Sequence, residues 1–488
     1  MRAAASSRWF AAQGSRPQDQ EREAMVDVAV IGAGPGGYVA ALRAAQLGAQ
    51  VVLIERDQVG GVCLNQGCIP SKALLRSVEV YRVACEGERF GVTTSGVKLD
   101  WRVAQARKRE VVKRLARGVE LLLDRAGAEV IWGEARFLSA DAIAVEAGDR
   151  IEARHFIIAT GSHPARPPIP GLDLSGVLDS QQALELEELP ESICIIGGGA
   201  IGVEFATLFV GAGMGVTLVE RLPRLLPTLD HSLGQRLQRS LKRRGVEVLT
   251  RARVTGVETA DGGLQITMVT EGGGRQVLLE KVLCAVGRQP NVEGLGLDAA
   301  GARYDTSGIQ VDDRMRTSVP TIYAIGDVAQ GRWQLAHVAS HEGIVAAENI
   351  CGQTTRMHYN AVPACVFSSP EVASVGLSEE EAREQGRDVR VGTFDLNGSS
   401  KALVYGEPEG FIKVVAEGEY GQVLGVHAIG PHVSELILEG AMAITLEATL
   451  EEFAATIHPH PTVSEALAEA ALAVEGRAIH SLKGYRCQ

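Results

Sequence analysis

Residues 27–37 read DVAVIGAGPGG, and residues 192–202 read SICIIGGGAIG. In each stretch a short apolar run rich in β-branched residues leads into a Gly-x-Gly-x-x-Gly turn and then into a helix-compatible segment. The three glycines of such a turn allow a tight bend, a close approach of the backbone to a pyrophosphate, and close packing of the helix on the strand. One match of this kind is a weak signal, because many glycine-rich turns satisfy it.

The second stretch repeats the landmarks of the first with a constant displacement of 165 residues, from 32 to 197 and from 55 to 220. The repeated pairs are Gly32 and Gly197, Gly34 and Gly199, Gly37 and Gly202, Gly48 and Gly213, and Glu55 and Glu220. A carboxylate at the second strand's end can accept from a ribose hydroxyl and repels a 2′-phosphate, so Glu220 favours NAD over NADP. The adjacent Arg221 weakens that preference. The repeat therefore predicts two dinucleotide sites.

Three further strand-like runs, 156–161, 283–287 and 321–326, also end at glycines. They fit strands that return to the same sheets, and they equally fit ordinary strand ends. Asp327 follows the last of these runs, where it can either reach cofactor hydroxyls or cap the next helix.

Composition limits the class of protein. The chain has 488 residues, of which 45% are hydrophobic and 22% charged, which fits roughly three domains of about 150 residues. The net charge of −12 argues against nucleic acid or an anionic membrane as a partner. The longest uncharged runs, 28–42 and 205–219, are shorter than the roughly 18 residues that a membrane-spanning helix needs.

The first 24 residues contain four arginines and, up to residue 18, no acid. They lack the apolar core of a secretory signal, and they fit a transit peptide, a disordered leader or an over-called start before Met25. We leave them outside the expected fold.

Residues 60–72 read GGVCLNQGCIPSK and place Cys63 and Cys68 five positions apart. A zinc site normally shows a second ligand pair at short spacing, and none is nearby, so we expect no metal. Two buried thiols remain an alternative. A redox-active disulfide is favoured because the pair adjoins a dinucleotide turn and Pro70 fits a helix start, whose N-terminus lowers a thiol pKa. A cysteine pair that alternates between dithiol and disulfide, rather than forming a permanent cross-link, indicates a cytoplasmic location.

Residues 458–465 read HPHPTVSE. His460 can accept a proton near neutral pH, and Glu465 can hold its tautomer through a hydrogen bond. A loop histidine is more often only structural, so spacing alone leaves catalysis open.

Taken together, the 60–72 stretch, the paired glycine turns, the AIGD run at 324–327 and the 458–465 tail resemble the flavoprotein pyridine nucleotide–disulfide oxidoreductases. The resemblance covers residues 25 to about 480 and is strongest to the members that oxidise dihydrolipoyl groups. Residues 362–376 resemble the start of the family's dimerisation domain.

The resemblance implies an α/β fold with two Rossmann-like dinucleotide-binding domains and an α+β carboxyl-terminal dimerisation domain. In this arrangement an NAD domain is inserted into an FAD domain. The expected bounds are 25–165 and 291–361 for the two parts of the FAD domain, 166–290 for the NAD domain and 362–488 for the dimerisation domain.

It also implies residue roles. Cys63 matches the thiol that exchanges with the substrate, Cys68 the thiol that lies against the flavin, and His460 and Glu465 the base and its orienting acid, supplied by the partner subunit of a homodimer. The residues that match FAD positions are Gly32, Gly34, Gly37, Glu55, Lys72, Ala135, Thr160, Gly161, Ser162, Asp327, Leu335, Ala336 and His337. Those that match NAD positions are Gly197, Gly199, Gly202, Glu204, Glu220, Val254 and Gly287.

The implied activity is the oxidation of dihydrolipoyl groups with NAD⁺, on the lipoylated domains of a 2-oxo acid dehydrogenase or glycine-cleavage complex. An NADH-dependent reductase of another small disulfide is the closest alternative, and a redox-silent binding scaffold is a more distant one. Mercuric reductases end in a vicinal cysteine pair, whereas this tail has the single Cys487. Val338 and His341 differ from the lysine and acid more common in the family, at positions that bear on the flavin environment.

Overall fold

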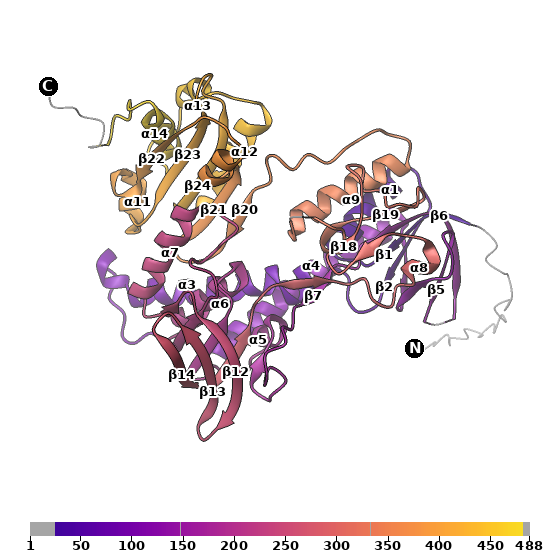
Figure 1. Cartoon of the computed structure of the whole chain (residues 1–488), viewed down its shortest axis with the longest axis horizontal. Coiled ribbons are helices and arrows are strands. Elements are labelled where there is room, and N and C mark those ends of the chain that lie inside the picture. The colour runs from indigo at the N-terminus through magenta and orange to yellow at the C-terminus, as the bar shows by residue number, and fades with distance from the viewer. Residues whose placement is uncertain (1–24, 147, 332, 482–488) are drawn as a thin grey trace, which may run out of the picture.

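The computed structural model describes residues 25–146, 148–331 and 333–481. The predictions for the leader, 1–24, and for Cys487 lie outside this part of the chain. In Figure 1 the first nucleotide-type sheet lies at the right, the second at the lower left and the carboxyl-terminal domain at the upper left.

The first sheet is built on β1 and its neighbours. Its strand order is β3-β2-β1-β6-β5-β4, with β19 paired to β6. The strands are β1 (Val26–Ile31), β2 (Val51–Glu55), β3 (Glu129–Trp132), β4 (Ala135–Phe137), β5 (Ala142–Val145), β6 (Arg150–Ile158) and β19 (Ile322–Ala324). The central strands β1 and β2 are almost wholly buried because both faces of the sheet are covered there, whereas the edge strand β3 is partly exposed.

The chain leaves this sheet after β6 and comes back to it at β19, which runs parallel to β6. The intervening segment builds a second parallel sheet in the order β11-β10-β9-β15-β8. Its strands are β8 (Val177–Leu178), β9 (Ser192–Ile196), β10 (Gly215–Val219), β11 (Glu247–Leu249) and β15 (Lys281–Cys284). An antiparallel sheet of β12 (Arg253–Ala260), β13 (Gly263–Thr270) and β14 (Gly273–Leu279) packs beside it. The expected fold class, one Rossmann-like unit interrupted by another, is confirmed.

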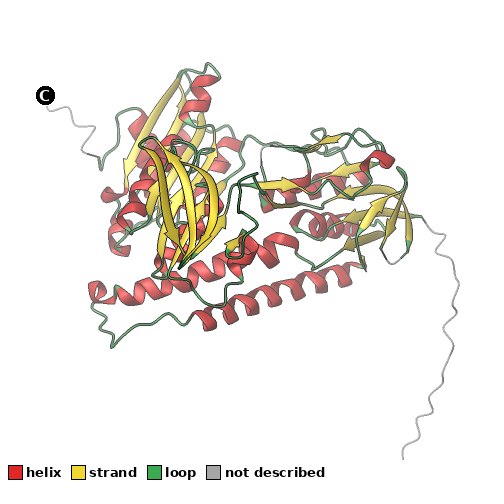
Figure 2. Ribbon diagram, turned by 60° about the horizontal axis from the view of Figure 1, so that its bottom comes forward, coloured by secondary structure: helices red, strands yellow, loops and turns green. Residues whose placement is uncertain are grey.

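Two long helices, which follow β2 along the chain, pack between the two nucleotide-type units. α3 (Cys68–Cys85) and α4 (Trp101–Ala126) pack against each other, and two long helices lie side by side along the lower edge in Figure 2. α4 begins where Asp100 accepts from the Val103 N–H and ends at Gly127, whose φ of +72° suits glycine. α3 also contacts α6 (Ala200–Gly211) of the second unit, so the two nucleotide-type units share a core.

The carboxyl-terminal domain is an antiparallel sheet in the order β20-β21-β24-β23-β22, packed with helices α12 and α14. Its elements include β20 (Ala364–Val366), β21 (Glu371–Gly376), α10 (Glu379–Glu384), β22 (Val389–Asp395), α11 (Ser400–Tyr405), β23 (Phe411–Glu417), β24 (Val423–Gly430), α12 (Val433–Thr445), α13 (Leu450–Ala455) and α14 (Glu465–Val474). No helix in the described part of the chain is both long and apolar enough to cross a membrane.

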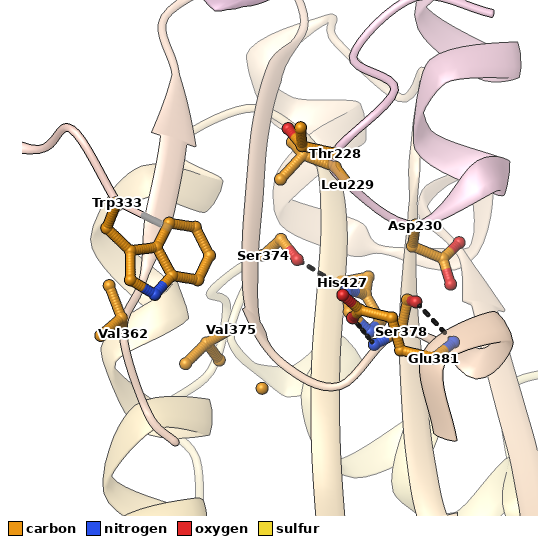
Figure 3. A pocket seen from close by; sticks show the side chains of 11 residues that line it. Thr228, Leu229, Asp230, Trp333, Val362, Ser374, Val375, Ser378, Glu381 and His427 are labelled. Atoms are coloured by element: carbon orange, nitrogen blue, oxygen red, sulfur yellow. Dashed lines mark hydrogen bonds between the residues drawn. The ribbon is translucent and has the colours of Figure 1, made fainter. Parts of the chain in front are cut away.

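A buried polar cluster joins the second nucleotide-type unit to this domain. Asp230, at the start of α7 (His231–Arg243), forms an ion pair with Lys413 on β23, with 2.8 Å between Oδ2 and Nζ. Beside it His427 is fully buried and hydrogen-bonded to Ser374 (Figure 3). Packing of the two domains therefore includes charged groups that water does not reach.

Candidate active site

The first glycine turn lies between β1 and α1 (Pro35–Gln46). Gly32 has φ +101°, and a Cβ there would lie 2.4 Å from the carbonyl oxygen of Ala159. A Cβ on Gly37 would lie 1.8 Å from the carbonyl oxygen of Gly32. Gly34 is different, because its Cβ would meet nothing within 4 Å. The turn is thus closed toward the protein and open at Gly34, where the backbone is accessible to a pyrophosphate.

The second turn, between β9 and α6, has the same geometry. Gly197 has φ +112° and lies against Ala285, and a Cβ on Gly202 would lie 1.9 Å from the carbonyl oxygen of Gly197. A Cβ on Gly199 again meets nothing within 4 Å. Both cradles therefore fit a dinucleotide, and the sequence repeat corresponds to a repeat in three dimensions.

Each turn is held by the carboxylate that ends its second strand. Glu55 accepts from the Ala33 N–H at 2.7 Å, and Glu220 accepts from the Gly198 N–H at 2.6 Å. The second oxygen of Glu220 accepts from Leu222 N–H at 2.6 Å, and both carboxylates are 8% exposed. These acids are fixed in place, which suits recognition of a ribose and opposes a 2′-phosphate.

The residues expected beyond these carboxylates occupy equivalent places in the two units. Gly133, two residues before Ala135, donates to the Glu55 carbonyl oxygen at 2.9 Å. Ala252, two residues before Val254, donates to the Glu220 carbonyl oxygen at 2.9 Å. Ala135 and Val254 therefore lie shortly after the strands, β3 and β11, that pair in parallel with the second strand of each unit.

Asp327 follows β19 and caps none of the described helices, and Ile325, two residues earlier, reaches the first turn, since a Cβ on Gly36 would lie 3.1 Å from the Ile325 side chain. Its Oδ2 accepts from Ser162 Oγ at 2.5 Å, and the short 3₁₀ helix Gly326–Val328 has no side-chain cap. Arg288 donates to Ser162 Oγ and to the Ser162 carbonyl oxygen, each at 2.7 Å. The sequence analysis missed Arg288, although it directly follows the predicted Gly287.

The strand end at Thr160 is tied to the same region. Thr160 Oγ1 donates to the Asn291 carbonyl oxygen at 3.0 Å, and Gly161, with φ +68°, accepts from the Asn291 N–H at 2.9 Å. Gly287 also has a positive φ, +123°. The segments that follow β6 and β15 pair with each other, which brings Thr160 and Gly161 of the first unit close to Gly287 of the second.

The predicted run Leu335-Ala336-His337 forms the start of α9 (Ala336–Ile350), with Leu335 as N-cap. α9 packs along α1 so closely that a Cβ on Gly36 would lie 3.0 Å from the Ala339 carbonyl oxygen. Two helix N-termini therefore face the same region, which favours an anionic cofactor. Val338 is buried, so the position that is more often a lysine in the family is apolar here. His341, at the position that is more often an acid, is exposed.

The thiol pair lies between two helices. α2 (Gly61–Gln66) carries Cys63, and α3 begins at Cys68, which confirms the expected helix start. Both are free thiols in this structure. A hydrogen bond from Cys63, together with the nearby Lys72 ammonium, lowers the pKa of Cys68 to about 7, and the same hydrogen bond raises the pKa of Cys63. The pair is suited to exchange in which Cys68 is the thiolate. The described residues contain no group of three His, Cys, Asp or Glu that could hold a metal.

Beside the thiols, Lys72 on α3 and Glu204 on α6 form an ion pair with 2.7 Å between Nζ and Oε2. Glu204 also accepts from the Phe367 N–H at 3.0 Å, and Lys72 Nζ lies 4.7 Å from the Phe367 ring centroid. From the sequence, Lys72 and Glu204 are expected at different cofactors, and no sequence signal indicates Phe367. This ion pair links all three parts of the fold next to the thiols.

His460 lies in the carboxyl-terminal domain, on the loop between α13 and α14. Its Nδ1 is 2.9 Å from Glu465 Oε1, and Glu465 also accepts from the Thr462 N–H at 2.9 Å. The side chain of His460 is 70% exposed. Among the described residues of one chain, no hydrogen bond or ion pair joins His460 to Cys63 or Cys68.

Two glycine cradles, a thiol pair between them and a separate histidine–carboxylate pair define a dinucleotide-dependent disulfide oxidoreductase. Residues 26–343 match the sequence family described as pyridine nucleotide-disulphide oxidoreductase, and residues 362–471 match its dimerisation domain. The chain belongs to this family, whose cofactors are FAD and NAD(H).

Named relatives and a solved structure agree with this assignment. The chain is 46% identical to a dihydrolipoyl dehydrogenase of Bacillus subtilis, a match that covers 93% of this chain and 99% of the relative. It is 44% identical to a dihydrolipoyl dehydrogenase of Halobacterium salinarum, covering 93% and 98%. A solved HOCl-induced flavoprotein disulfide reductase, RclA from Escherichia coli, is 30% identical with a TM-score of 0.82, covering 91% of this chain and 99% of that one.

Proposed function

We propose that this chain oxidises dihydrolipoyl groups and passes the electrons to NAD⁺. The observation that carries the proposal is the thiol pair, with Cys68 poised as thiolate beside Lys72 and Glu204 and with a dinucleotide cradle on each side. The relatives named dihydrolipoyl dehydrogenase, which match along almost their whole length, support this substrate over another small disulfide.

The protein's side chains carry the exchange of thiols. A substrate thiol gives its proton to Nε2 of His460, since Nδ1 is engaged by Glu465. The thiolate attacks Sγ of Cys63, breaks the Cys63–Cys68 disulfide and releases Cys68 as thiolate. The second substrate thiol then attacks the mixed disulfide, and its proton passes to Cys63. FAD and NAD⁺, when bound, supply the removal of the two electrons held by the reduced pair.

The proposal includes a homodimer in which His460 comes from the partner. Within one chain His460 is exposed and does not contact the thiols. α12 exposes Leu438 and Met442, and its C-cap residue Leu446 continues the same stripe; the three are 61%, 52% and 69% exposed. A second copy would cover such an apolar stripe and complete each site. The partners would be the lipoylated domains of a 2-oxo acid dehydrogenase or glycine-cleavage complex, in the cytoplasm.

The test is an anaerobic titration with dihydrolipoamide, followed by flavin absorbance and by NADH formation. We expect a long-wavelength band from contact between the Cys68 thiolate and the flavin, and we expect Cys68→Ser to abolish both the band and NADH formation. Cys85→Ser, at the other end of the same helix, is the matched control and should leave both unchanged. A band that persists in Cys68→Ser would contradict the assignment of the thiols.

The base assignment has its own test. Replacing His460 by Gln should lower dihydrolipoamide turnover by about 10²–10⁴-fold, the range that general-base catalysis supplies. Oxidation of NADH by an artificial dye does not need a substrate thiol and should remain within about twofold of wild type. Equal loss in the two assays would mean that His460 supports the fold rather than the chemistry.

A further inference from the structure

Glu342 is a buried carboxylate that the proposed chemistry does not use. It lies on α9 and is 5% exposed. One oxygen, Oε2, accepts from the Gly326 N–H at 2.6 Å, and the other, Oε1, accepts from the Tyr359 hydroxyl at 2.7 Å. A buried carboxylate is costly unless such donors satisfy it, so its position is closely defined.

The backbone group that Glu342 holds is next to a predicted FAD residue. Gly326 precedes Asp327 and has φ +67°, and a Cβ on it would lie 3.0 Å from the Ala339 Cβ. The residue before it, Ile325, donates to the Ile158 carbonyl oxygen at 2.9 Å, so the strand side of the loop is already fixed. The hydrogen bond to Glu342 fixes the Ile325–Gly326 peptide, one residue before the Cα that carries the Asp327 side chain.

Tyr359 anchors the same carboxylate from outside the sheet. It lies in the connection between α9 and the carboxyl-terminal domain, and burial and the charge of Glu342 raise the pKa of its hydroxyl. The phenol therefore remains protonated and a donor at neutral pH. On the opposite side, Ser162 donates to Asp327. The loop is thus held between Ser162 and the Tyr359–Glu342 pair.

We propose that Glu342 is a positioning residue for FAD: by holding the Gly326 N–H it sets the direction of Asp327 toward the cofactor, with Tyr359 as its second anchor. This inference rests on the assignment of Asp327 to the FAD site in the proposed function.

The test measures FAD affinity of the flavin-free protein by quenching of flavin fluorescence. Glu342→Leu leaves the buried Gly326 N–H without its acceptor and should raise the FAD dissociation constant about 10- to 100-fold. Glu342→Gln can still accept from Gly326 through its amide oxygen and should stay within about threefold of wild type. Glu348→Leu is the matched control: it lies on the same helix, loses an ion pair to Arg43 and should not change FAD affinity.

The outcomes separate positioning from general packing. Equal loss of FAD affinity in Glu342→Leu and Glu348→Leu, or unchanged affinity in Glu342→Leu, would overturn the inference. If Glu342→Leu does not fold, Tyr359→Phe carries the test: a rise of about threefold or more supports the inference and no change overturns it. Wild-type protein that binds no FAD would instead contradict the proposed function itself.

Discussion

The Cys68 thiol is the first residue of α3 and is flanked by Cys63 and Lys72. In Lys72→Met the cation is gone, whereas the negative charge of Glu204, which raises the pKa of Cys68, remains, so the thiolate is disfavoured. We expect the pKa of Cys68 to rise from about 7 toward the ordinary value of 9. Alkylation of Cys68 by iodoacetamide, followed by mass spectrometry across pH, measures this.

Lys72→Met should shift the pH dependence of Cys68 alkylation to higher pH. In the wild type, alkylation of Cys68 should become fast as pH rises through about 7, whereas in Lys72→Met it should stay slow until at least about one unit higher. Lys98→Met, at an exposed lysine, is the control and should follow the wild type. Coincident profiles for all three proteins would rule out Lys72 as the group that lowers this pKa.

At the scale of elements, the three motif glycines of each strand–turn–helix unit are of two kinds: two pack against protein atoms and one faces open space. Gly199→Ala adds a methyl group where nothing lies within 4 Å, at a φ of −75° that alanine accepts. We expect unchanged thermal stability and an NADH dissociation constant raised about tenfold or more, because the methyl group enters the cradle. Thermal unfolding and NADH titration check the two parts.

The contrasting variant is Gly202→Ala, in which the methyl group would lie 1.9 Å from a backbone oxygen. Overpacking of this kind costs about 1–3 kcal/mol, so this variant should lose stability of the second unit. If Gly199→Ala and Gly202→Ala lost stability equally, the open face of the turn would not be the cofactor cradle.

At the scale of the whole molecule, the domains are joined by charge as well as by apolar packing. Lys413 lies 2.8 Å from Asp230, whose side chain is fully buried, and 2.9 Å from Glu379. Lys413→Met leaves a buried carboxylate uncompensated and should lower the free energy of unfolding by about 3–5 kcal/mol in a urea titration. Arg102→Met, which breaks an ion pair exposed on both sides, should cost at most about 1 kcal/mol.

The same ion pair predicts an acid dependence. Burial opposes ionisation of Asp230, but His427 and Lys413 outweigh it and lower the pKa of its carboxyl from 3.8 to about 2. Because the folded-state pKa is the lower one, the stabilisation is complete above about pH 4 and is lost as the pH falls toward 2. Urea unfolding between pH 5 and 2 should show a shallower decline for Asp230→Asn than for the wild type. Parallel declines would exclude this contribution.

Many structural features of the molecule depend on neighbouring residues alone and could be predicted from the sequence. The apolar runs that precede the two glycine turns are observed as the strands β1 and β9, and Glu55 and Glu220 lie at the ends of the second strands, β2 and β10. Both glycine turns, and a helix start close to the expected Pro70, also follow from neighbouring residues. Such features depend on backbone conformations that a few adjacent residues determine.

By itself, then, the sequence determined the two glycine cradles, the thiol pair and the class of chemistry. The tertiary structure decided which side chains meet: Lys72 with Glu204, Arg288 with Ser162 and Glu342 with Gly326. Two of these pairs join residues more than 120 positions apart, and the third, Glu342 with Gly326, depends on the placement of α9 after β19 returns to the first sheet. The reason is physical, since periodicity and turn chemistry act along the chain, whereas ion pairs and buried hydrogen bonds form between surfaces that only packing brings together.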